Sequence, residues 1–191
     1  MDLATLQAEA RQGVRHKFVY FWGHHPPADG SIGPSCLSQW WHSPFRVEGV
    51  TYPTAEHYMM AEKARLFGDE DAAARILESD NPGEVKAIGR TVRHFINEIW
   101  EGRRYDIVVR GNLAKFGQHA DLKSFLLGTR ERVLVEASPV DRIWGIGLAA
   151  SDPKAGDPEA WRGLNLLGFA LMDVRERLGG AATLPPPSRL R

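Results

Sequence analysis

The chain has 191 residues, of which 43% are hydrophobic and 25% are charged, a composition typical of one globular domain rather than of a disordered or fibrous chain. Its 24 basic and 24 acidic residues give a net charge of zero, which argues against sequence-independent binding to a nucleic-acid backbone. A local basic patch is still compatible with this charge. The one cysteine, Cys36, excludes an intramolecular disulfide and a Cys-based zinc site from this chain alone. No apolar run approaches the ~18 residues of a membrane helix, and the first fifteen residues lack a signal-peptide pattern. We therefore expect a cytoplasmic protein.

The first half of the chain contains the strand signals. Aromatic and β-branched residues predict a strand over 17–22, and prolines and glycines predict a loop over 24–35. Two short runs on either side of Glu48-Gly49 predict a β-hairpin. Helical periodicity then dominates, with helices predicted after Thr54, over 69–78, from Asn81-Pro82, over 97–116, over 121–129 and from Asn165 to Leu178.

Only one further strand interrupts the helices, over 132–136. The fold class is therefore α+β with helices predominant and a few short strands. We expect three parts: an N-terminal extension over 1–16, a single domain over 17–179, and a proline-rich, disordered tail over 180–191.

Two apparent motifs do not fit their usual context. His24-His25, His42 and His57 lack the helical spacing of metal ligands, so we expect no metal site. The G-x-G-x-x-A pattern over 145–150 matches a dinucleotide fingerprint, but Ser151-Asp152-Pro153 stops any helix that would follow it. Its glycines are better explained by a turn or by a close backbone approach to a ligand.

Carboxylates and indoles leave two interpretations open. Glu56 lies in the first turn of a helix with buried character, where the helix dipole favours its ionised form. Glu56 either complements that dipole at the surface or takes part in acid–base catalysis. Lys63, on the same face, either binds a phosphate or is solvated. The six tryptophans either fill the core or stack on a flat ligand.

Seven blocks of sequence, in this order, carry a resemblance to a known family. They are FWG, LSQWWHSPF, YPTAEHYMMAEKA, AIGR, KFGQHADLKSFLLGT, LVEASPVDRIWGIG and RGLNLLGFALMDVRERL. From about Phe18 to Leu178 the chain closely resembles the NADAR, or YbiA-like, family. The resemblance implies a compact, mostly helical α+β domain with N-glycosidase activity.

Three alternatives for the function are open, of which the family resemblance implies the first two. One branch hydrolyses the C–N bond between phosphoribose and the pyrimidine amine of riboflavin-pathway intermediates, and this is the activity we expect. Another branch removes ADP-ribose attached through nitrogen, including from guanine in nucleic acid, which would make nucleic acid a partner only as a modified substrate. A non-catalytic binder of ADP-ribose or a nucleotide is the third alternative.

By motif match, the resemblance implies that Glu56 and Asp141 are catalytic. Breaking an N-glycosidic bond builds positive charge on the ribose, and carboxylates can stabilise that charge or activate water. No metal and no organic cofactor is needed. The residues expected to bind substrate are Trp40, Lys63, Arg90, Trp100, Trp144 and Asn165.

The chain departs from the family pattern at two places. Gln39-Trp40 stands where the family commonly has Asn and Phe, so a sugar or base contact is expected to differ. Residues 148–162 are extra relative to close relatives, and we expect this insertion to border the pocket and to affect substrate preference.

Overall fold

The computed structural model describes residues 1–180 and confirms a predominantly helical α+β fold with short strands. Residues 181–191, most of the predicted tail, lie outside the described part. The elements in chain order are α1 (Leu3–Arg11), β1 (Phe18–Phe21), η1 (Pro34–Leu37), β2 (Phe45–Val47), β3 (Val50–Tyr52), α2 (Ala55–Leu66), α3 (Glu70–Glu78), α4 (Pro82–Arg90), α5 (Asn97–Gln118), α6 (Ala120–Gly128), β4 (Val133–Glu136), η2 (Pro158–Ala160) and α7 (Leu166–Gly180).

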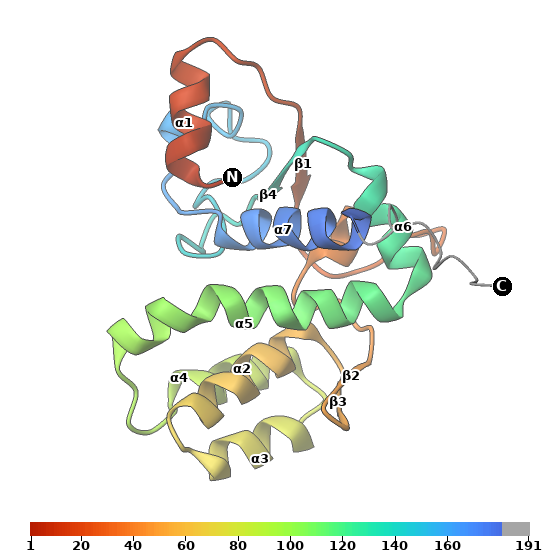
Figure 1. The fold of residues 1–191 in the computed structure, drawn as a ribbon, viewed down its shortest axis with the longest axis vertical. Coiled ribbons are helices and arrows are strands. Elements are labelled where there is room, and N and C mark those ends of the chain that lie inside the picture. The colour runs from red at the N-terminus through yellow and green to blue at the C-terminus, as the bar shows by residue number, and fades with distance from the viewer. Residues whose placement is uncertain (181–191) are drawn as a thin grey trace, which may run out of the picture.

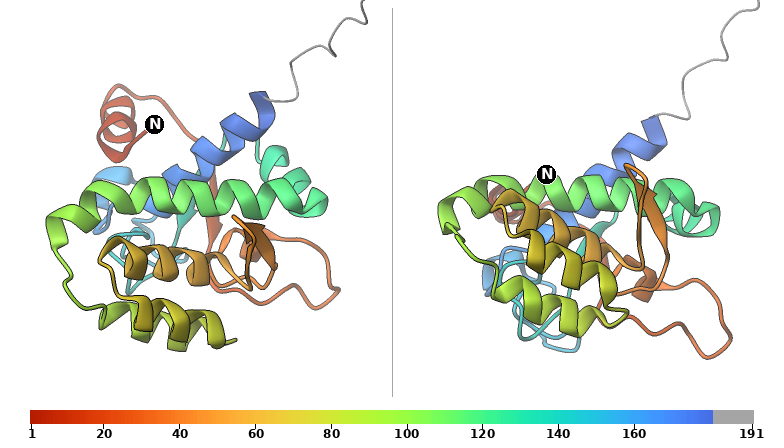
Figure 2. Two further views of the ribbon diagram at one scale, coloured as in Figure 1. Left: turned by 60° about the horizontal axis from the view of Figure 1, so that its bottom comes forward. Right: turned by 90° about the horizontal axis from the view of Figure 1, so that it is seen from below.

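The long helix α5 lies at the centre of the molecule (Figure 1). It packs against α2 on one side and α7 on the other. Helices α2, α3 and α4 form a layer on the first side, while α7 lies against β4 on the second, and the views of Figure 2 show the same arrangement. The main hydrophobic core fills the space between these layers, with Tyr58, Ile76, Phe116 and Leu171 among its buried members.

Strands β1 and β4 pair in parallel, with Phe18 opposite Val133 and Phe21 opposite Glu136. Both strands therefore end at the same edge. In open α/β sheets the carboxyl ends of parallel strands are where ligands bind, and here the segments after Phe21 and Glu136 both enter the candidate site.

The ends of α2 and α4 follow the local chemistry predicted for them. The Thr54 hydroxyl caps α2 by accepting from the His57 backbone N–H at 3.4 Å, and Gly68 beyond its end has a φ of 69°, which favours glycine. Asn81 caps α4 by accepting from the Gly83 N–H at 2.8 Å. The Glu84 carboxylate accepts from the Ser79 hydroxyl at 2.7 Å, and the Asn81 N–H donates to that hydroxyl at 3.1 Å.

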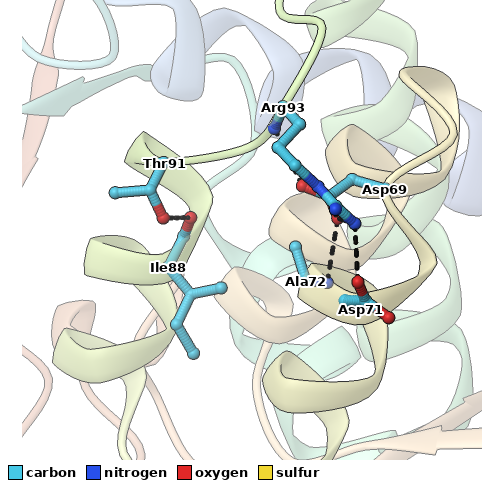
Figure 3. A network of polar contacts seen from close by, with 6 residues as sticks. All are labelled: Asp69, Asp71, Ala72, Ile88, Thr91 and Arg93. Atoms are coloured by element: carbon cyan, nitrogen blue, oxygen red, sulfur yellow. Dashed lines mark hydrogen bonds and ion pairs between the residues drawn. The ribbon is translucent and has the colours of Figure 1, made fainter.

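An ion-pair network fastens the layer of α2, α3 and α4 (Figure 3). The Arg93 guanidinium donates to Asp69, the N-cap residue of α3, at 2.7 Å and to Asp71 at 2.7 Å. The Arg93 backbone N–H donates to the second oxygen of Asp69 at 2.8 Å. These hydrogen bonds from Arg93 lower the pKa of the Asp69 carboxyl. The network ties the start of α3 to the chain that leaves α4.

Helix α1 packs against the 148–162 insertion. Leu6 of α1 is fully buried in a second hydrophobic cluster that includes Ala155 and Trp161. The Gln7 side chain donates to the Pro158 carbonyl at 3.0 Å. The prediction that this insertion borders the pocket is wrong, because its side chains pack against α1 and none lines the pocket.

Candidate active site

One pocket of about 910 Å³ lies where α2, α4, the start of α5 and the segments after β1 and β4 meet. Its volume is near the upper end of the range typical of small-molecule sites. Seven of the eight predicted site residues line it: Trp40, Glu56, Lys63, Arg90, Trp100, Asp141 and Trp144. Sequence-distant residues thus converge on one cavity, as expected of a single site.

Glu56 lies at the base of this pocket in the first turn of α2. It is only 3% exposed, its backbone N–H donates to the Gln39 carbonyl at 3.0 Å, and its Oε1 has no hydrogen-bond partner among residues 1–180. Burial raises the pKa of Glu56 to about 7, against the opposing effects of Lys86 and a hydrogen bond from Trp40. Desolvation thus works against the ionised form that the position of Glu56 in the first turn of α2 favours.

The Asp141 carboxylate, which also lines the pocket, is held in place by hydrogen bonds within its own turn. Its Oδ1 accepts from the backbone N–H groups of Ile143 at 2.9 Å and of Trp144 at 2.8 Å, and its backbone N–H donates to the Ser138 hydroxyl at 3.1 Å. These bonds fix the carboxylate and bring the Trp144 indole, which also lines the pocket, into a defined place. The same hydrogen bonds therefore position two predicted site residues, Asp141 itself and Trp144.

The glycines of the G-x-G pattern permit this turn. A Cβ on Gly145 would lie 2.8 Å from the Glu136 carbonyl oxygen, and Gly147 has a φ of 68°. They serve a tight turn and close backbone packing, in agreement with the first of the two predicted explanations.

A third carboxylate, Glu136, faces the same pocket and was not predicted. It is the last residue of β4, and its Oε2 is buried without a hydrogen-bond partner in the described part of the chain. Burial, together with the nearby Asp141 and Glu56, raises the pKa of Glu136 to about 8, against the opposing effect of Lys86. The available signal was a glutamate at the end of a run of buried aliphatic residues. Its burial depends on a partner strand that the sequence does not identify.

Three cations from α2 and α4 line the pocket. Lys63 donates to the Gly89 carbonyl at 2.7 Å, and its ammonium lies 4.3 Å from the ring centre of Phe95 and 5.5 Å from that of Trp100. Burial lowers the pKa of Lys63. Arg90 is exposed at the rim, and Lys86, one turn before it, was not predicted. Residues four apart share a helix face, so α4 presents both cations to the pocket.

Aromatic rings surround the mouth and one wall. The His24 ring lies 4.3 Å from that of His25 and 5.5 Å from that of Trp40, and Trp22 beside them is 60% exposed. Trp100, which also lines the pocket, is buried. The interpretation of the tryptophans as core filler holds for Trp41 and Trp161, which are buried away from the pocket.

Asn165 does not line the pocket. It is fully buried, its Oδ1 accepts from the Glu136 backbone N–H at 3.0 Å, and its Nδ2 donates to the Leu134 carbonyl at 2.9 Å. The predicted substrate contact is therefore corrected to a structural role. The side chain is used to bind the edge of β4 and does not cap α7, whose start it precedes.

A second cavity of about 410 Å³ beside α1 is mostly apolar, and the one carboxylate among its lining residues, Asp2, caps α1. No three His, Cys, Asp or Glu side chains gather as a metal site within residues 1–180. None of the helices in this range is long and apolar enough to cross a membrane.

Comparison with known proteins gives consistent similarities. Residues 20–179 match a family model described as the NADAR domain. N-glycosidase R617 of Acanthamoeba polyphaga mimivirus is 42% identical over 165 residues, which cover 84% of this chain and 95% of that protein. N-glycosidase YbiA of Escherichia coli strain K12 is 34% identical over 135 residues, 71% of this chain and 76% of that protein. The NMR structure of Escherichia coli YbiA superposes with a TM-score of 0.72 at 27% identity and covers 93% of this chain and 94% of that chain.

Proposed function

The chain belongs to the NADAR domain family, and from this we propose that it is an N-glycosidase whose substrate is a phosphorylated ribose joined through C1 to an aminopyrimidine nitrogen. The observation that carries the proposal is the convergence of Glu56, Glu136 and Asp141 on one pocket that also holds cations and indoles. N-glycoside hydrolysis needs these three kinds of group, namely carboxylates for the sugar cation, cations for a phosphate and flat rings for a base.

The reaction begins with weakening of the bond between ribose C1 and nitrogen, which builds positive charge on C1 and the ring oxygen. The carboxylate of Asp141, fixed by two backbone N–H groups, supplies negative charge that requires no rearrangement as the cation develops. Glu56, with a pKa of about 7, is matched to accept a proton from the attacking water near neutral pH.

The phosphate and the base occupy the remaining walls in this proposal. Lys86 and Arg90 on α4 are the available phosphate partners, because neither donates a hydrogen bond within residues 1–180, whereas Lys63 already donates to the Gly89 carbonyl. Lys63 instead provides positive charge beside Trp100. The base stacks on Trp40 or Trp144, two half-buried tryptophans that line the pocket.

A second candidate, removal of ADP-ribose from a nitrogen of guanine, is favoured by the size and mouth of the pocket. The volume of about 910 Å³ leaves room for more than a mononucleotide, and the rings of Trp22, His24 and His25 at the mouth could receive a second base.

The deciding experiment offers both substrates to the same enzyme. The protein is incubated with 5-amino-6-ribosylaminouracil 5′-phosphate and, separately, with DNA that carries ADP-ribosylated guanine, and the released products are separated by chromatography. We expect release of the aminopyrimidine and ribose 5-phosphate. Cleavage of the DNA adduct alone would select the second candidate, and cleavage of neither would overturn the N-glycosidase proposal for these substrates.

A further inference from the structure

We propose that Glu136 is the proton donor to the leaving nitrogen, so that the pocket works with an acid on β4 and a base on α2. This inference rests on the proposed N-glycosidase function and adds a third catalytic group to it. It stands on the position of the Glu136 side chain, on its unpartnered oxygen and on the unequal distribution of charge among the three carboxylates of the pocket.

The backbone of Glu136 is fixed on both sides. Its N–H donates to Asn165 Oδ1 at 3.0 Å, and its carbonyl accepts from the Ile146 N–H at 2.9 Å. The parallel pairing places Glu136 opposite Phe21, so the side chain leaves the sheet at the edge where the pocket opens. Its Oε2 is inaccessible to solvent and unpartnered within the described chain. A buried polar oxygen without a partner is rare in native structures and calls for an explanation.

The three carboxylates differ in what surrounds them. Asp141 has two backbone N–H donors on one oxygen. The charged groups that act on Glu56 are two cations, Lys86 and Arg90, and one carboxylate, Asp141, and Glu56 also receives a hydrogen bond from Trp40.

Glu136 has the weakest support for a negative charge. The charged groups that act on it are Asp141, Glu56 and Lys86, that is, two carboxylates and one cation. Carboxylates that share a site cannot all ionise together. A proton shared among the three is therefore best accommodated on Glu136, and its pKa of about 8 agrees with this.

A protonated carboxyl supplies what the leaving group requires. When the C1–N bond breaks, its electron pair goes to nitrogen, and an amine nitrogen leaves readily only if it gains a proton. Glu136 gives its proton to that nitrogen, while the water oxygen bonds to C1 and loses a proton to the Glu56 carboxylate. One water is consumed, the amine and the ribose hydroxyl product are released, and a proton returns from Glu56 to Glu136 through solvent.

The test compares Glu136→Gln with the wild type across pH, with Glu131→Gln as a matched control at an exposed glutamate outside the pocket. Gln keeps the shape of Glu136 and can donate a hydrogen bond, but it cannot transfer a proton. We expect kcat on the ribosylaminopyrimidine phosphate to fall by ~10²–10⁴, the loss of wild-type activity near pH 8 to vanish from the profile, and the control to keep wild-type kcat. A variant that retains more than a tenth of wild-type kcat would overturn the inference.

The state of the proton is read separately in the free protein. A titration of the glutamate side-chain carboxyls by carbon-13 NMR, with the Glu136 signal assigned by its loss in Glu136→Gln, should give a value far above 4.5. A Glu136 that titrates near 4.5 would overturn the inference even if the enzyme is active. Wild-type protein that cleaves no riboside would instead overturn the proposed function. If Glu136→Gln does not fold, Glu136→Asp provides the assignment and is expected to reduce kcat as well.

Discussion

Replacing Glu56 by Gln tests whether Glu56 is a buried catalytic base or a helix-dipole residue, because only the first predicts a gain in stability together with a loss of activity. Glu56 is 3% exposed and its pKa is raised from 4.5 to about 7. The folded protein therefore holds this proton more tightly than the unfolded chain does. Stability from this group is complete below pH 4.5 and is lost as the pH rises from 4.5 to 7. The ionised form costs about 3 kcal/mol in the folded state.

Gln has the shape of Glu without the charge, so Glu56→Gln should be more stable than the wild type above pH 7 by up to about 3 kcal/mol. For a chain of this size that corresponds to roughly 6–12 °C in Tm. The same change should lower kcat by ~10²–10⁴, the usual contribution of a general base, with KM nearly unchanged because the sugar charge develops only in the transition state.

The assay measures Tm and kcat of the variant at pH 5 and pH 8.5. The matched control is Glu70→Gln, at an exposed glutamate in the first turn of α3, which should lose at most ~1 kcal/mol of stability as a helix-dipole residue and keep full activity. If Glu56→Gln behaves like Glu70→Gln, or keeps more than a tenth of wild-type kcat, the assignment of Glu56 as the base is refuted.

Three further predictions concern the rest of the molecule. Asp141→Asn, which can still accept the two backbone bonds, should lower kcat by ~10²–10³ through loss of charge while Trp144 fluorescence stays unchanged; full activity would remove Asp141 from the catalytic group. Asp69→Asn should lower Tm at pH 7, and because the pKa of Asp69 is depressed, the difference from the wild type should shrink as the pH falls below 3.8; a difference that stays constant into acid would contradict the role of the Arg93 pairing. Dialysis against EDTA should leave kcat unchanged, since residues 1–180 form no metal cluster; activity that is lost and then restored by a divalent ion would contradict this.

Local chemistry carried much of the fold prediction. Thr54 and Gly68 delimit α2 because capping and positive φ depend on neighbouring residues alone. The hairpin around Glu48-Gly49 is confirmed by the antiparallel pairing of β2 with β3. Helix α1 was not predicted, because the 1–16 segment buries a single residue, Leu6, against an insertion more than a hundred residues away.

The site was predicted less completely than the fold, because part of it depends on contacts between residues that lie far apart in the sequence. Motif positions such as Glu56 and Asp141 carry their own signal, whereas the burial of Glu136 depends on a parallel pairing between strands that most of the chain separates. Asn165 has the sequence of a helix cap, yet its amide binds β4 because that strand edge offers a buried N–H and a carbonyl together. Long-range contacts, rather than propensity, decided both residues.

The central claim is that substrate binds in the pocket between α2, α4 and the end of β4. It is tested most directly by titrating inactive Glu56→Gln with the ribosylaminopyrimidine phosphate and observing the indole N–H signals of the six tryptophans by NMR. The account predicts shifts at Trp40, Trp100 and Trp144, which line the pocket, and none at Trp161, whose indole donates to the Ala155 carbonyl at 2.8 Å in the second cluster. Shifts confined to Trp161, or the absence of any shift at saturating substrate, would contradict the claim.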